Sequence, residues 1–320
     1  MRPTVTILIT TKDRKDELGR ALESALIQTD VDEILVFDDG SSDGTGAMIC
    51  SRFPSVRYER SAAPLGIVAA RNRAMHLARG SVVVTIDDDC EFQSRLTVHN
   101  TLKDLAAHSR IGAVAIPHIN VNLSPVVHSV APRADGTYVL SEFTGCANAV
   151  WRELFIKVGG YNPVLWRQTE EYDFCTRLLD RGYVVRCGTA PPIFHYESPS
   201  RSLSSIIYHI VRGHFLYAWH NVPWPYFPIH ATATAASKLL YGLERNQFKP
   251  AVLGLGGAMW AILSSEAVRS PVSCGGYRLM RRLRKHGPIQ LSAVVAALPC
   301  VDPACADCPS GVPVDDGHGD

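Results

Sequence analysis

Alternation of strand-like and helix-like segments in the first 90 residues limits this chain to few folds. Four short runs rich in β-branched residues have the length and composition of buried strands: residues 5–10, 33–37, 56–58 and 82–86. Three segments between them repeat apolar side chains at helical spacing: residues 18–26, 45–53 and 69–78. Such alternation predicts an α/β fold with a mostly parallel sheet between helices, whose ligands bind beyond the carboxyl ends of the strands.

The chain then continues with a less regular pattern. Residues 96–107 predict a helix and residues 111–116 a strand. Residues 126–130 and 137–143 flank Asp135-Gly136, and an Asp-Gly turn between alternating segments predicts a hairpin or an antiparallel excursion from the sheet. We divide the chain into a catalytic domain over residues 1–200, a helical extension over 201–297 and a disordered tail over 298–320.

Three consecutive carboxylates, Asp87, Asp88 and Asp89, follow the apolar run of residues 82–86. Their like charges repel, so a cation or solvent must offset them. Mg²⁺ and Mn²⁺ prefer oxygen ligands and keep positions open for water and substrate phosphates. The alternative is a solvated turn, because Asp is common in turns and helix caps. We favour a metal site, which a second strand-end pair, Asp38 and Asp39, can join.

Composition restricts the possible partners and the cellular compartment. The 32 basic and 31 acidic residues leave a formal charge of +1, so no overall field favours nucleic acid. The chain starts without an apolar signal segment, and we expect a cytoplasmic protein. Six cysteines are scattered singly, which favours reduced thiols, while Cys300, Cys305 and Cys308 in the tail lack the paired spacing of a structural zinc site.

The segment after residue 200 has a different character. Residues 202–219 are helical in pattern and lead into a junction rich in aromatic residues and proline. Residues 251–263 are apolar but too short to cross a bilayer, which needs about 20 residues. A basic run follows between Arg278 and Lys285. Two interpretations stay open: peripheral contact with the inner face of a membrane, or packing against the first domain or another subunit of a homo-oligomer.

Four short motifs occur in a recognisable order: residues 10–14 (TTKDR), 38–45 (DDGSSDGT), 66–72 (GIVAARN) and 86–89 (IDDD). With them the chain resembles family-2 glycosyltransferases of the GT-A fold over roughly its first 200 residues. This resemblance implies a nucleotide-diphosphosugar donor, a divalent cofactor, Mn²⁺ or Mg²⁺, and inversion at the transferred sugar. The acceptor stays open between a glycan, a lipid-linked sugar and a small metabolite.

The resemblance also implies a donor site. Its nucleotide-sugar-binding residues would be Thr10, Thr11, Asp13, Asp38, Asp39, Arg71, Asn72, Asp87, Asp88 and Gly145. The metal would be held by Asp89 first, with Asp87 and with His195, which follows another short apolar segment. Two alternatives come from the residues themselves: His195 caps a strand, and residues 38–43 form an ordinary turn and helix cap.

Residues 169–178 (TEEYDFCTRL) resemble the acidic helix start that supplies the family's catalytic base. Glu171 takes the catalytic position, where many relatives carry Asp, and Glu170 is the alternative base. A carboxylate here would deprotonate the acceptor hydroxyl as it attacks the anomeric carbon. As a structural alternative, acidic residues in a first helical turn stabilise the helix dipole, and Asp173 and Arg177 are spaced for an i,i+4 ion pair.

We therefore expect an inverting glycosyltransferase that moves a hexosyl or deoxyhexosyl group. One alternative is a sugar-1-phosphate nucleotidyltransferase, although an early Gly-rich segment with a basic residue to hold a triphosphate is missing. Another is a non-catalytic nucleotide-sugar-binding module, which Glu in place of the usual Asp supports. A glycosidase has little need for the nucleotide-site motifs or the metal cluster.

Overall fold

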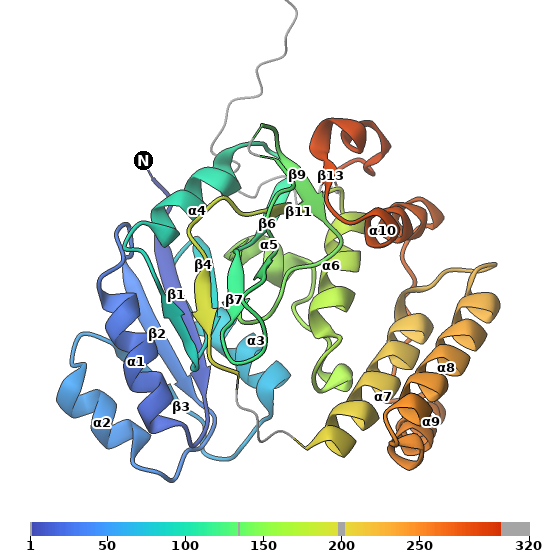
Figure 1. Ribbon diagram of the computed structural model, residues 1–320, viewed down its shortest axis with the longest axis horizontal. Coiled ribbons are helices and arrows are strands. Elements are labelled where there is room, and N and C mark those ends of the chain that lie inside the picture. The colour runs from blue at the N-terminus through green and yellow to red at the C-terminus, as the bar shows by residue number, and fades with distance from the viewer. Residues whose placement is uncertain (1, 134, 198–201, 302–320) are drawn as a thin grey trace, which may run out of the picture.

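The computed structural model describes residues 2–133, 135–197 and 202–301. Residues 302–320, which hold most of the expected tail with Cys305 and Cys308, lie outside this range. A nine-stranded sheet forms the centre of the molecule, in the order β13-β9-β11-β6-β10-β4-β1-β2-β3 (Figure 1). A four-stranded sheet, β5-β12-β7-β8, lies beside it.

The parallel half of the large sheet has the predicted strands and helices. Its strands are β1 (Val5–Thr11), β2 (Glu33–Asp38), β3 (Arg57–Arg60) and β4 (Val82–Asp87). The connecting helices are α1 (Lys15–Leu26), α2 (Thr45–Arg52) and α3 (Ile67–Leu77). All seven residues of β1 are buried, so both faces of the sheet are covered, as expected for an α/β fold.

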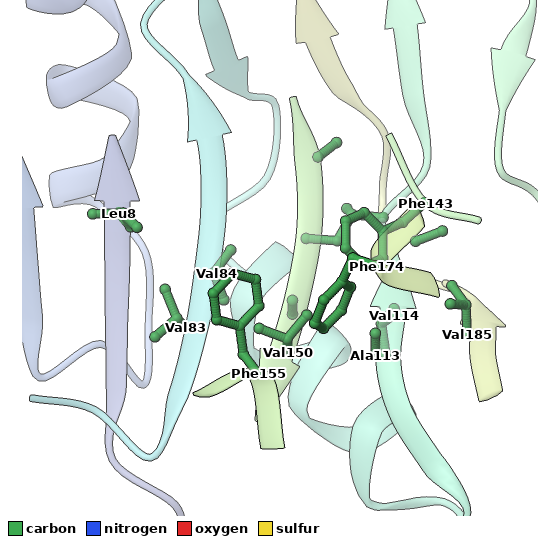
Figure 2. Packing of buried hydrophobic residues seen from close by; sticks show 14 of the residues in the cluster. Leu8, Val83, Val84, Ala113, Val114, Phe143, Val150, Phe155, Phe174 and Val185 are labelled. Carbon is green, nitrogen blue, oxygen red and sulfur yellow. The ribbon is translucent and has the colours of Figure 1, made fainter. Parts of the chain in front are cut away.

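The other half of the large sheet is mixed. Strand β10 (Ala147–Trp151) runs antiparallel to both β4 and β6 (Ile111–Ala115), and β11 (Val184–Cys187) runs parallel to β6. Helices α4 (Thr97–Ala106), α5 (Arg152–Lys157) and α6 (Glu170–Asp180) cover this half, with a 3-10 turn at Pro163–Leu165. Phe155 and Phe174 pack with their ring centroids 4.8 Å apart beside Val150 and Val114 (Figure 2).

Of the two expectations for the segments around Asp135-Gly136, the hairpin is wrong and the antiparallel excursion is confirmed. Strand β8 (Val127–His128) pairs with β7 (His118–Asn120) in the small sheet, whereas β9 (Tyr138–Leu140) pairs antiparallel with β11 in the large sheet. Both residues of β8 are exposed, while Tyr138 and Val139 of β9 are buried. Burial of the apolar side chains of β9 therefore decides its partner, and the local turn signal does not.

The C-terminal segment is helical, as expected, and its end returns to the sheet. It contains α7 (Leu203–Asn221), α8 (Phe227–Glu244), α9 (Phe248–Leu263) and α10 (Cys274–His286). Helices α7, α8 and α9 pack together, α10 packs on α6, and β13 (Ile289–Gln290) pairs with β9 (Figure 1). Among the described helices, none combines the length and apolar character required to span a bilayer.

Candidate active site

The three aspartates stand at the carboxyl end of β4, and Arg14 supplies a cation for them. Its Nη1 donates to Asp88 Oδ1 and its Nη2 to Asp89 Oδ2, each at a distance of 2.9 Å. Thr11 Oγ1 donates to the other oxygen of Asp88 at 2.8 Å. Since β1 and β4 are parallel neighbours, the residues that follow both strands meet at one edge. Arg14 belongs to the TTKDR motif but was not among the predicted site residues; its place just after β1 was the available signal.

Strand pairing in the small sheet brings His195 to the aspartates from more than 100 residues away. Strand β12 (Ile193–His195) pairs with β5 (Cys90–Phe92) so that His195 lies opposite Cys90, next to Asp89. His195 Nε2 is 3.2 Å from Asp89 Oδ1, and its Nδ1 is 2.7 Å from Asn120 Oδ1. The structure thus brings His195 to the Asp cluster, and its role as a metal ligand, which the resemblance implies, stays a prediction.

Asp89 is held as a carboxylate. Burial raises its pKa, but the hydrogen bond with His195 and the charges of His195 and Arg14 outweigh burial and lower the pKa to about 2. Burial lowers the pKa of His195, but contacts with Asp89 and Cys146 raise it to about 10. Asp88 differs, because burial raises its pKa to about 7 despite the opposing charge of Arg14.

The residues at this edge fit a hard divalent ion. Asp87, Asp89 and His195 each offer one ligand atom, and these atoms lie within 4.8 Å of one another. Asp89 Oδ1 and His195 Nε2 are buried, and beyond each other neither has a hydrogen-bond partner among the described residues. Two carboxylates and one imidazole are a donor set that Mn²⁺ accepts readily and that Mg²⁺ also tolerates.

Arg71 connects the aspartates with the acidic helix. Its Nη2 donates to Asp87 Oδ1, while its Nη1 lies 3.4 Å from Glu171 Oε1 and 3.5 Å from Glu170 Oε1. The residue is only 5% exposed. The buried guanidinium of Arg71 therefore lies between three carboxylates. The sequence analysis expected one of them, Asp87, on the donor side and the two glutamates on the acceptor side.

The absence of a side chain at Gly145 allows Arg71 and Glu171 to lie close to the backbone before β10. Strand β10 pairs antiparallel with β4 with Ala147 opposite Ile86, so the residues before β10 lie beside the Asp cluster. A Cβ atom on Gly145 would lie 2.3 Å from Glu171 Oε1 and 2.6 Å from Arg71 Nη1. Both distances are too short for any side chain, which makes glycine a requirement while Arg71 and Glu171 stay in place.

The two glutamates at the start of α6 have different surroundings. Glu170 Oε2 accepts a hydrogen bond of 2.9 Å from the backbone N–H of Thr169, and the Glu170 side chain is 3% exposed. The Glu171 side chain is 17% exposed. Burial and the neighbouring charge of Glu170 raise the pKa of Glu171 well above its ordinary value, although Arg71 opposes them.

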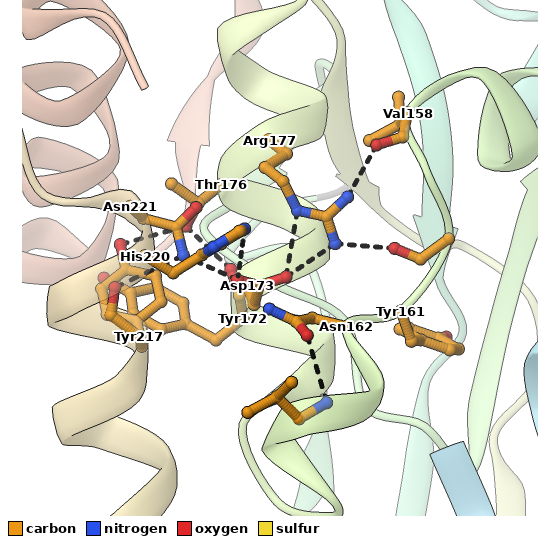
Figure 3. Close-up of polar contacts among 12 residues, drawn as sticks. Val158, Tyr161, Asn162, Tyr172, Asp173, Thr176, Arg177, Tyr217, His220 and Asn221 are labelled. Atoms are coloured by element: carbon orange, nitrogen blue, oxygen red, sulfur yellow. Dashed lines mark hydrogen bonds and ion pairs between the residues drawn. The ribbon is translucent and has the colours of Figure 1, made fainter. Parts of the chain in front are cut away.

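A buried network fixes helix α6, and Figure 3 shows its members. Arg177 donates to Asp173 Oδ2 from both Nε and Nη2, so the i,i+4 ion pair expected from the sequence is confirmed. Arg177 also donates to the carbonyl oxygens of Val158 and Gly160, and Asn221 Nδ2 of α7 donates to Asp173 Oδ1. These contacts anchor the acidic helix to a loop and to the C-terminal helices.

Several residues of the expected nucleotide site hold loops in the protein. Asp39 accepts from the N–H groups of Leu65 and Gly66, where α3 begins. Asp38 accepts from the N–H of Ser41, the turn that was the alternative for this segment, and from the hydroxyl of Tyr58.

Three more residues of the expected nucleotide site differ in whether their polar atoms already have a hydrogen-bond partner. Asp13 Oδ1 accepts from the N–H of Ser42. Asn72 binds both the N–H and the carbonyl of Tyr161. Thr10 Oγ1 is buried at the end of β1 and has no hydrogen-bond partner among the described residues.

Comparison with known proteins agrees with this geometry. Residues 6–159 match the family described as Glycosyl transferase family 2. The chain is 33% identical over 215 residues to the succinoglycan biosynthesis protein ExoU of Rhizobium meliloti (strain 1021), over 58% of this chain and 61% of ExoU. It is 35% identical over 92 residues to ExoO, a succinoglycan biosynthesis protein of the same strain, over 27% of this chain and 26% of ExoO. The chain thus spans about three fifths of the length of one relative and a quarter of the other.

Two solved structures share the fold. One is the mannosyltransferase PcManGT from Pyrobaculum calidifontis in complex with GDP-Man and Mn²⁺, with a TM-score of 0.53 and 20% identity over 93% of this chain and 86% of that chain. The other is S. aureus TarS 1-349 in complex with UDP-GlcNAc, with a TM-score of 0.57 and 14% identity over 81% of each chain. Residues 6–159 thus match glycosyl transferase family 2, and the chain shares the GT-A fold of these structures.

Proposed function

We propose that this protein transfers a sugar from a nucleotide-diphosphosugar to an acceptor hydroxyl with inversion, and that Glu171 is the general base. The observation that carries the proposal is the contrast within the glutamate pair. Both glutamates lie within 3.5 Å of Arg71, but one oxygen of Glu170 is committed to a backbone N–H, whereas Glu171 is the more exposed of the two. A base needs an oxygen that the acceptor can reach.

The donor side is assigned to the edge that carries the Asp cluster. Asp87, Asp89 and His195 would hold Mn²⁺ or Mg²⁺, which would stabilise the charge of the diphosphate leaving group. Arg14 and Thr11 fix Asp88 and one oxygen of Asp89, so the ligand atoms are ordered before an ion binds. The ligands in the names of the two solved structures, GDP-Man with Mn²⁺ and UDP-GlcNAc, support a nucleotide-sugar donor.

The acceptor side is assigned to the start of α6. The acceptor oxygen attacks the anomeric carbon opposite the diphosphate, and its proton passes to Glu171 as the new bond forms. The bond between the anomeric carbon and the phosphate oxygen breaks as the new bond forms, and the nucleoside diphosphate leaves with the electron pair. The raised pKa of Glu171 makes it a stronger base than a solvated carboxylate. The role of ExoU in succinoglycan biosynthesis supports a glycan or a lipid-linked glycan as acceptor.

The proposal is tested with a matched pair of variants, Glu171→Gln and Glu170→Gln. Purified protein is incubated with Mn²⁺ and a panel of nucleotide-sugars, and nucleoside diphosphate release is followed with and without candidate acceptors. Thermal shift then measures donor binding, because a bound ligand raises the melting temperature. We expect Glu171→Gln to lose turnover by about 10²-fold or more and to keep donor binding, and Glu170→Gln to lose less. Full turnover in Glu171→Gln would exclude the proposed base.

We also propose that helices α8 and α9 rest on an anionic membrane surface. Residues 250–263 contain no charged side chain, and the outer surface of this helix pair exposes Ile229, Leu253, Trp260 and Leu263 by 55% or more. The basic helix α10 touches the start of α8, where Tyr277 and His230 share a hydrogen bond of 2.8 Å. An apolar surface beside basic residues matches the interface of an anionic bilayer.

A further inference from the structure

A second group of possible metal ligands adjoins the Asp cluster and shares His195 with it. Cys90 is the first residue of β5, Cys146 precedes β10, and His195 ends β12. Their ligand atoms lie within 4.8 Å of one another, and the residues are 0%, 2% and 7% exposed. Pairing of β12 with β5 places His195 opposite Cys90, so the register of the small sheet creates this group together with the donor-side site.

The chemistry of this group differs from that of the aspartates. Two thiolates and one imidazole are soft and borderline ligands, which select Zn²⁺, Co²⁺ or Cd²⁺ over Mg²⁺ and Mn²⁺. His195 Nδ1 is already paired with Asn120, so Nε2 is the ring atom left for a metal. This Nε2 is buried and has no hydrogen-bond partner among the described residues, apart from the contact with Asp89. Asp89 Oδ1 lies 3.2 Å from the same Nε2 but belongs to the other group of ligand atoms, so the remaining position is left for water.

We propose that Cys90, Cys146 and His195 form a binding site for Zn²⁺ and similar thiophilic ions, and that this site competes with the donor-side metal for His195. One imidazole nitrogen binds only one ion, so an ion held by the two sulfur atoms removes His195 from Asp87 and Asp89. Binding releases the thiol protons to solvent. The competition rests on the proposed function, whereas the binding of Zn²⁺ does not.

Binding is tested on the full chain with Co²⁺ as a spectroscopic probe, with no donor or acceptor present. We expect one equivalent of Co²⁺ to give a sulfur-to-cobalt charge-transfer band that Zn²⁺ abolishes. The band is lost in the Cys90→Ser, Cys146→Ser double variant and kept in Cys187→Ser, whose thiol is also buried but lies in β11. Absence of the band in the wild-type protein, or its survival in the double variant, would overturn the site.

Cadmium NMR of the wild-type protein gives the same answer without substitution, because the shift of bound Cd²⁺ reports its sulfur ligands. Two sulfur ligands support the site, and one or none excludes it, even where the double variant does not fold.

Competition is measured as Zn²⁺ inhibition of nucleoside diphosphate release at fixed Mn²⁺. We expect about tenfold more Zn²⁺ to be needed in the double variant than in wild type. Equal inhibition in both would overturn the competition. If no turnover is detected with any donor, the proposed function fails while the Co²⁺ and Cd²⁺ spectra still decide the site.

Discussion

One carboxyl group in each acidic cluster, Asp89 in the first and Glu171 in the second, has a pKa shifted in the opposite direction to the other. On the donor side, Asp89 contacts Arg14 and His195, and these partners lower its pKa to about 2. On the acceptor side, Glu171 has Arg71 at 3.4 Å, and burial beside Glu170 raises its pKa. The difference shows that the partners of a carboxylate, more than its type, determine whether its pKa falls or rises.

Asp89→Ala breaks the donor side and carries the largest expected effect. The substitution removes the proposed ligand and leaves Arg14 and His195 without one of their charge partners. We expect turnover with Mn²⁺ to fall by about 10³-fold or more. Initial rates and isothermal titration with Mn²⁺ check this result. Asp135→Ala is the control, because its carboxylate is exposed and pairs with Arg133. Unchanged Mn²⁺ affinity in Asp89→Ala would contradict the ligand role.

Gly145→Ala tests the close packing between the two sides. The added Cβ would overlap Glu171 Oε1 and Arg71 Nη1, so these groups must separate. We expect turnover to fall by about 10²-fold, because small displacements of catalytic groups are costly. The measurement compares rates and melting temperatures with those of Gly256→Ala in α9, where an added Cβ would meet nothing within 4 Å and φ, as at Gly145, is not positive. A wild-type rate in Gly145→Ala would show that the contact between Arg71 and Glu171 is unimportant.

The pH profile sharpens the acceptor side. A protonated Glu171 cannot take a proton, and its pKa lies above the ordinary value of 4.5, so activity should rise with pH through that raised pKa. The acidic limb of kcat/KM is therefore expected well above pH 4.5. Arg71 lowers the pKa of Glu171, and Arg71→Lys, which weakens the paired contact, should move the limb to higher pH. A limb at the ordinary carboxyl pKa, or a shift to lower pH, would refute the assignment.

The smallest effect on turnover is expected far from both clusters. Trp260→Ser in α9 removes a side chain that is 69% exposed, so the rate with a soluble acceptor should stay within about twofold. Binding to anionic vesicles, measured by co-sedimentation, should weaken several-fold because an apolar anchor is lost. Wild-type sedimentation of the variant would contradict membrane contact. A wild-type dimer in light scattering that the variant loses would assign the surface to a second copy of the chain.

The sequence predicted the parallel half of the fold well because each strand and helix there is marked by the composition and spacing of its own residues. Residues 5–10 and 82–86 have the composition of buried strands, and the order of the motifs placed Asp87 to Asp89 and Glu171 at strand and helix ends. Which distant strands pair with each other was harder to predict from the sequence. The antiparallel excursion expected after residue 126 is confirmed, but its alternative, a hairpin, is wrong because β9 buries its side chains against β11.

The same limit applies within the site. His195 was named from resemblance, but its meeting with Asp89 depends on the register between β12 and β5. Arg71 was assigned to the nucleotide, yet three carboxylates surround it in the protein. Neither the register of a three-residue strand nor the choice among buried charge partners can be read from periodicity or spacing.

Pairing of β9 with β13 has a consequence for how the protein is made. Residues 138–140 leave the ribosome long before Ile289 and Gln290, which later cover one edge of β9. During synthesis of the intervening 148 residues, that edge is open to pairing with other chains. Helices α7, α8 and α9 are made in the same interval, so their exposed apolar side chains coexist with the open strand. A nascent chain is most vulnerable to aggregation in this interval, and a chaperone would be most useful there.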